Sequence, residues 1–159
     1  MRCGVLEPLR LIVAPSDVHF MRQALLQAER AYEENEVPIG AVIVSEHMII
    51  GRGYNQTERL QDPTAHAEVL AITAACDYLG SRILKDCTLF VTVEPCPMCA
   101  GALKWAQIGR VVYGASEPKS GFSLHAPPLL HPKTQISRGV MEHECSALMQ
   151  DFFRRRRNT

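Results

Sequence analysis

The sequence predicts an α/β protein in which helices cover a layered sheet. Runs typical of buried strands alternate along the chain with segments whose apolar residues recur every three or four positions, as in a helix. Hydrophobic residues make up 47% of the chain and charged residues 21%, which is an ordinary globular mixture. The 159 residues show no internal repeat, low-complexity linker or break in composition. We therefore expect one α/β domain.

The individual elements follow from caps, periodicity and turn-forming residues. Ser16 or Asp17 can cap a first helix, because apolar residues then recur at helical steps from Met21 to Tyr32. Four of the ten prolines lie in residues 115–134, which we interpret as a loop. Strands are predicted at residues 40–44, 48–54, 88–93, 110–113 and 135–140, and the later helices at residues 69–76, 98–106 and 142–156.

The first residues differ from the rest. Pro8 and Pro15 bracket a short apolar stretch, so we expect residues 1–16 to form an N-terminal arm that is poorly ordered or loosely docked. The single domain then covers residues 17–159. Charged residues interrupt the arm before any apolar run is long enough for a signal or a membrane span. This pattern predicts a cytoplasmic protein with no membrane partner.

Charge and cysteine content exclude two further classes. The formal net charge is zero, which excludes a basic field over the whole surface but not a local basic patch for nucleic acid. Six cysteines could suggest a disulfide scaffold. A chain of this length can build its own core, however, and no secretion signal is visible, so we expect reduced thiols.

Two short segments indicate the chemistry. TAHAEVLAI, at residues 64–72, contains His-x-Glu, and VTVEPCPMCAGAL, at residues 91–103, contains Pro-Cys-x-x-Cys. Together they match the known signature of zinc-dependent nucleobase deaminases. Alone, each would be weak, because a Cys-x-x-Cys fits a redox pair or a structural zinc knuckle equally well and a His-x-Glu is nearly uninformative. Their combination, with a proline on each side of Cys96, favours a catalytic zinc site.

The spacing of the cysteines explains how such a site forms. Cys96 and Cys99 lie on one face of the first turn of a helix that begins near Cys96, and Pro97 suits that turn because its missing N–H is no loss there. The positive end of the helix favours the thiolate form, which binds metal. With His66 as the third ligand, we expect one Zn²⁺ per chain with the fourth tetrahedral position open to water.

Glu68 is the predicted catalytic residue. It follows His66 by two positions, so it lies close to the metal but points in a different direction. A carboxylate there can take a proton from water, protonate a ring nitrogen and then protonate the departing ammonia. A purely structural zinc site would gain nothing from it.

With these motifs the chain resembles the bacterial tRNA-specific adenosine deaminases, within the cytidine deaminase-like superfamily. The resemblance covers about residues 18–157. The shared segments are EVPIGAV at residues 36–42, Asn55, DPTAHAE at residues 62–68, VEPCPMCAGAL at residues 93–103 and DFFRRRR at residues 151–157. It implies a three-layer α/β/α fold with a five-stranded mixed sheet, and a homodimer whose subunits meet near the active sites. It also implies that the enzyme converts the wobble adenosine of an arginine tRNA to inosine.

The resemblance assigns further roles by position. The residues implied to bind the substrate base are Val37, Pro38, Asn55 and Ala67, the last through its backbone. Those implied to contact the anticodon stem-loop are Phe152, Phe153, Arg154 and Arg157. Single-stranded loops are bound by stacking and by backbone cations, and this tail offers both. A purely structural role is the alternative for these residues. Asn55 would then only form the turn that ends its strand, and the arginines would only be a solvated helix end that the helix dipole favours.

Two departures leave alternatives open. The segment at residues 117–135 is a few residues shorter than usual in these enzymes, and Glu117 stands where an aspartate is usual. PCPMCAGALKWA, with Trp105, is similar to bacterial guanine deaminases, although those lack the Phe-Phe-Arg helix end. A deaminase of guanine or another free base or nucleoside is therefore the second hypothesis. A zinc-containing RNA-binding protein without turnover is the third.

Overall fold

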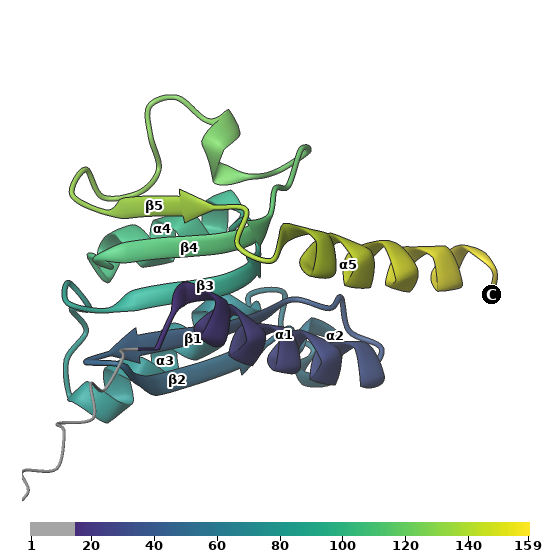
Figure 1. Ribbon diagram of the computed structural model, residues 1–159, viewed down its shortest axis with the longest axis horizontal. Helices are drawn as coiled ribbons and strands as arrows, with labels where there is room; N and C mark the ends of the chain where they lie inside the picture. Colours follow the sequence, from purple (N-terminus) through teal and green to yellow (C-terminus); the bar gives the residue numbers. More distant parts are fainter. Residues whose placement is uncertain (1–14) are drawn as a thin grey trace, which may run out of the picture.

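The structure is a computed structural model that describes residues 15–159. Its elements are α1 (Asp17–Glu33), β1 (Gly40–Ser45), β2 (Met48–Tyr54), α2 (Thr57–Leu60), α3 (Ala67–Leu79), β3 (Thr88–Val93), α4 (Pro97–Trp105), β4 (Arg110–Ala115), the 3-10 turn η1 (Phe122–Leu124), β5 (Gln135–Arg138) and α5 (Glu142–Arg157). The five strands form one sheet that is covered by helices on both faces, and α5 extends beyond its edge (Figure 1).

The sheet has the strand order β2-β1-β3-β4-β5. β1 pairs antiparallel with β2 and with β3, whereas β3, β4 and β5 run parallel to one another. The prediction of a three-layer α/β/α fold with a five-stranded mixed sheet is therefore confirmed. Because β3 and β4 are parallel, the loops after both strands leave the same edge of the sheet, which is where α4 begins.

Each face of the sheet has its own apolar core. Side chains that alternate along a strand point to opposite faces. Val42, Phe90 and Val112 pack with α1 and α5 on one side, while the neighbouring positions Ile43 and Val111 pack with α3 and α4 on the other. The helices therefore divide between the two faces in pairs, and the pair α3 and α4 carries the predicted metal ligands.

Two glycines in β2 bring α3 close to the sheet. A Cβ atom at Gly53 would lie 2.2 Å from the backbone oxygen of Ala67, and one at Gly51 would lie 2.5 Å from that of Ala71. Real Cβ atoms do not approach so closely, so only glycine permits this packing. The first turn of α3 is thereby held directly against the strand.

The structure also differs from the expected elements. The predicted helix at residues 69–76 begins earlier, at Ala67, and the strand predicted at residues 135–140 ends at Arg138 because Gly139 adopts a φ of +79°. The helices α2 and η1 were not predicted, since neither carries an apolar period. Ser16 is the cap of α1 and accepts the N–H of His19. Residues 1–14 of the predicted arm lie outside the described part of the chain.

Membrane insertion can be judged for the described helices. Between residues 15 and 159, no helix combines the length and the apolar character that a membrane span requires.

Candidate active site

Two helix N-termini form the centre of the site. His66 is the N-cap of α3 and Cys96 is the N-cap of α4, and both have extended backbone conformations. Pro97 occupies the start of α4, as the sequence predicted. Cys99 follows on the same turn of α4 and is fully buried. The positive ends of both helix dipoles therefore point at one small region, which favours anionic groups there.

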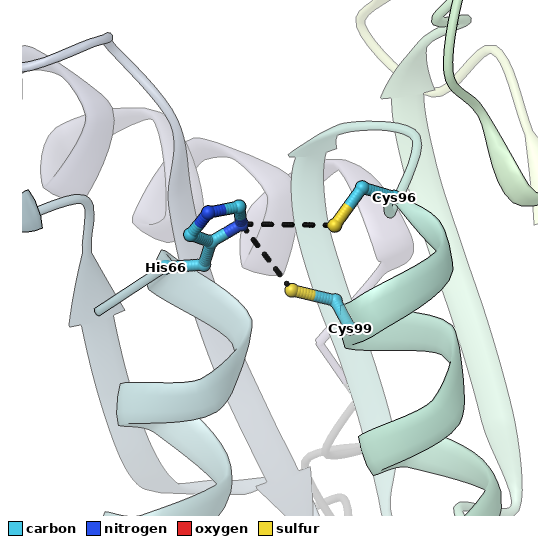
Figure 2. A group of neighbouring side chains, drawn as sticks. All are labelled: His66, Cys96 and Cys99. Atoms are coloured by element: carbon cyan, nitrogen blue, oxygen red, sulfur yellow. Dashed lines mark hydrogen bonds between the residues drawn. The ribbon is translucent and has the colours of Figure 1, made fainter. Parts of the chain in front are cut away.

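The three predicted ligands come together in this region. Figure 2 shows the imidazole of His66 directed at the two sulfur atoms from across the gap between α3 and α4. The distances from His66 Nδ1 are 3.7 Å to Cys96 Sγ and 3.6 Å to Cys99 Sγ. Within residues 15–159, this is the one group of three such side chains whose ligand atoms all lie within 4.8 Å of one another.

These distances fit one zinc ion. Tetrahedral zinc lies about 2.3 Å from a cysteine sulfur and about 2.0 Å from a histidine nitrogen, which separates the two ligand atoms by about 3.6 Å. The observed nitrogen–sulfur separations agree with that value. A tetrahedral ion has four positions, and His66, Cys96 and Cys99 can fill three of them. The donor set therefore suits a catalytic rather than a closed structural site.

The surroundings shift the pKa values of the three ligands in different directions, since the side chain of Cys96 and burial raise the pKa of the Cys99 thiol. Hydrogen bonds from the side chains of Cys99 and His66 lower the pKa of the Cys96 thiol to about 4, which stabilises the metal-binding thiolate. The pKa of His66 is raised, chiefly by the side chain of Cys96 and in smaller part by the backbone of Pro63. Pro63 lies in a tight turn. The Oδ1 atom of Asp62 closes this turn by accepting both the backbone N–H and the hydroxyl of Thr64.

Glu68 lies in the first turn of α3, beside the ligand cluster. Its side chain is only 3% exposed. Burial raises the pKa of this carboxyl. A buried carboxylate so close to a metal site has no packing advantage over an apolar side chain, which points to a role in proton transfer.

Asn55 and Ala67 lie next to each other at the same edge. The Oδ1 atom of buried Asn55 accepts the backbone N–H of Ala67 at 2.9 Å. Because Oδ1 is engaged, the NH₂ group is what Asn55 can offer to a ligand. Val37 is half-buried and Pro38 is buried, and both directly precede β1.

The tail residues divide between the core and the surface. Phe152 is 5% exposed and packs against both Tyr32 and Phe153. Phe153 is 40% exposed. Arg154 and Arg155 both pair with Asp151, at 2.5 and 3.2 Å. The hydroxyl of Tyr32 also donates a hydrogen bond to Asp151.

A groove of about 730 Å³ separates α5 from the loop after β4. Its floor contains Val93 and Ala115, the last residues of β3 and β4, so it starts beside the segment that carries Cys96. Its rim is largely basic and aromatic, with Lys119 on the loop and Phe153, Arg156 and Arg157 on α5, and the loop also contributes the acidic Glu117. The sequence did not single out Lys119 or Arg156, because a loop has no period and a run of four arginines does not reveal which face each occupies.

Comparison with known proteins agrees with this geometry. Residues 15–115 match the family described as the cytidine and deoxycytidylate deaminase zinc-binding region. A tRNA-specific adenosine deaminase of Agrobacterium fabrum is 43% identical over 144 residues, which cover 87% of this chain and 95% of the relative. The chain belongs to the tRNA-specific adenosine deaminase family. Membership in this deaminase family makes the chain a hydrolytic enzyme with a zinc-binding domain, and the His66–Cys96–Cys99 cluster is its candidate zinc site.

Solved structures of deaminases are also similar to this chain in fold and sequence. One comes from a study of A-to-I editing by tRNA:A34 deaminases at the wobble position of transfer RNA. It is 42% identical, has a TM-score of 0.77, and covers 82% of this chain and 98% of its own. A guanine deaminase from Bacillus subtilis is 44% identical but covers only 61% of this chain and 62% of its own, with a TM-score of 0.58.

Proposed function

We propose that this deaminase converts the wobble adenosine of a tRNA anticodon, that of an arginine tRNA, to inosine and releases ammonia. One observation carries the proposal. A groove with basic and aromatic residues on its rim is lined by Val93, the last residue of β3, which precedes the zinc ligand Cys96 by three residues. A free base has no phosphate and would gain nothing from such a rim. Since tRNA is the substrate, the cytoplasmic location expected from the sequence belongs to the same proposal.

Glu68 would carry the protons of the reaction. When bound, zinc supplies the Lewis acidity that lowers the pKa of a water molecule to about 7. Glu68 takes a proton from the water that attacks C6 of adenine and delivers it to the ring nitrogen N1. The C6–O bond forms, and Glu68 then takes the second proton from the new hydroxyl on C6. It passes this proton to the exocyclic nitrogen as the bond from C6 to that nitrogen breaks, which leaves the C6 carbonyl of inosine and releases ammonia.

The neighbouring residues would hold the base. The NH₂ group of Asn55 is free to donate to an acceptor atom of the purine, because its Oδ1 is fixed by Ala67. The same hydrogen bond fixes the start of α3, so the backbone at Ala67 would keep a constant position beside the base. Val37 and Pro38 would form an apolar wall of the pocket. Adenine can enter it only after unstacking from its loop.

The groove would bind the nucleotides on either side of the target. Lys119, Arg156 and Arg157 can neutralise phosphates, and Phe153 can stack on a base. Of the tail residues that the sequence assigned to RNA, Phe153 and Arg157 line this groove. Phe152 is buried against Tyr32 of α1, so we assign it to anchoring α5. Arg154 pairs with Asp151 of the same helix and does not line the groove.

Removing the two groove arginines should weaken RNA binding in a salt-dependent way. We expect Arg156→Ala/Arg157→Ala to lower kcat/KM for an anticodon stem-loop about tenfold at low salt, because two phosphate contacts are lost. The slope of log(kcat/KM) against log[salt] should become shallower by about 1.4. The matched control is Arg82→Ala/Lys85→Ala, which removes the same charge from exposed positions outside the groove. Unchanged kinetics and slope in the groove variant would reject this surface.

We also propose a homodimer. Large apolar side chains are exposed on the layer formed by α3 and α4, among them Tyr78 and Leu79 on α3 and Trp105 on α4, the last 79% exposed. These side chains lie at the C-terminal ends of the two helices whose N-terminal ends carry the zinc ligands, so the interface would lie on the same layer as the sites. Light scattering at micromolar concentration should give twice the chain mass of 17.7 kDa. A stable and fully active monomer would contradict the proposal.

Guanine remains the second candidate substrate. The segment at residues 95–106, with Trp105, is similar to bacterial guanine deaminases, and the Bacillus subtilis enzyme is 44% identical over its matched part. The two candidates make opposite forecasts, because guanine turnover should not depend on the charges of the groove.

A further inference from the structure

Glu94 is a buried carboxylate that the proposed chemistry does not use. It is 5% exposed and lies between the end of β3 and the Pro95–Cys96 pair. The backbone N–H of Glu117 donates to its Oε2 atom at 2.9 Å, and the backbone N–H of Ser123 donates to its Oε1 atom at 3.1 Å. One side chain thus joins both ends of the loop at residues 117–123 to the segment that carries a zinc ligand.

Further contacts hold the same loop tightly. A Cβ atom at Gly121 would lie 2.3 Å from Glu94 Oε2, so the loop approaches the carboxylate as closely as only glycine allows. The next residue, Phe122, donates its N–H to the carbonyl of Pro95 at 3.0 Å. Its ring packs edge-on against Tyr113 of β4, with 6.0 Å between the ring centroids. The loop is therefore fixed against the motif on one side.

The other side of this loop forms a wall of the RNA groove. Pro118 and Lys119 line the groove opposite Phe153 and Arg156 of α5. Lys119 is held in place by its N–H, which donates to the side chain of Glu117. Glu94 itself is not among the residues that line the groove. Its influence on the substrate must therefore pass through the loop.

We propose that Glu94 is a positioning residue that sets the place of the loop wall, and with it the width of the groove that receives the RNA. This inference rests on the proposed RNA substrate. Because Glu94 touches the loop and not the groove, it affects how tightly the stem-loop binds and leaves the chemical step unchanged. Both carboxylate oxygens are needed, since each accepts one backbone N–H, whereas an amide has only one oxygen that can accept.

Glu94→Gln tests the inference, with Glu36→Gln as the matched control. Glu36 is also a buried carboxylate, 2% exposed, that accepts backbone N–H groups, but these belong to Glu58 and Arg59 at the start of α2. Loss of a bond to a buried group typically changes an equilibrium by about tenfold. We therefore expect hydrogen exchange at the amides of residues 117 and 123 to accelerate at least about tenfold in Glu94→Gln and to stay unchanged in Glu36→Gln.

The kinetics of Glu94→Gln provide the second readout. We expect KM for the anticodon stem-loop to rise about tenfold while kcat stays within about threefold of wild type. Unchanged exchange at residues 117 and 123, or a loss in kcat with KM unchanged, would overturn the positioning role. The exchange measurement needs no substrate, so it separates this inference from the proposed function. A wild-type enzyme that fails to deaminate the stem-loop would instead overturn that function.

Discussion

Glu68→Ala is expected to lower kcat for the anticodon stem-loop by about 10³- to 10⁴-fold, with zinc content and fold preserved. The buried carboxylate moves more than one proton in the proposed reaction, so the expected loss lies at the upper end of the range for general acid–base catalysis. Glu68 is not among the three clustered ligand residues, so its removal should leave the metal in place. Glu68→Gln should be equally inactive, because an amide keeps the shape of the side chain but cannot carry the proton.

Single-turnover deamination measures this loss directly, with zinc per chain and thermal unfolding recorded on the same samples. The thermal comparison removes a trivial explanation, because a variant that unfolds early would lose activity for another reason. Activity of either variant within about tenfold of wild type would reject the assigned role.

Cys99→Ala is expected to abolish zinc binding and, with it, activity. Cys99 is fully buried and supplies one of three protein ligands, so its loss leaves only His66 and Cys96. Removing even a supporting partner of a metal ligand costs about 10- to 100-fold in affinity or activity, and removal of a ligand itself should exceed that. We expect far less than one zinc per chain and more than about 100-fold loss of turnover.

Elemental analysis of the purified protein checks the zinc content. Cys76→Ala is the matched control, since Cys76 is a half-buried cysteine of α3 that is not in the ligand cluster. It should retain one zinc per chain and wild-type turnover. Full retention of zinc and activity in Cys99→Ala would remove Cys99 from the site.

The sequence predicted the features that depend on short-range patterns. The apolar run that became β1 and the segment that became β3 were placed within one residue of their observed bounds. The zinc site was predictable because Cys96 and Cys99 occupy one turn, and because Pro97 marks where that turn begins. These signals require no knowledge of distant parts of the chain.

The features that escaped prediction depend on contacts between distant segments. Phe152 and Phe153 are neighbours of the same type, and only the position of Tyr32 on α1 decides that Phe152 faces inward. The hydroxyl of Tyr32 on α1 also bonds to Asp151 of α5, a contact between residues that are far apart in the sequence. The buried carboxylate of Glu94 could not be assigned for the same reason, since its partners lie more than twenty residues away in a loop without periodicity.

We expect this zinc deaminase to act on a tRNA anticodon and not on a free base. The most direct test presents one preparation with an arginine tRNA anticodon stem-loop and, separately, with free guanine. Nucleoside analysis of the digested stem-loop should show inosine in place of adenosine at the wobble position, with kcat/KM far above that for guanine. Faster turnover of guanine than of the stem-loop, with no dependence on Arg156 and Arg157, would contradict the account.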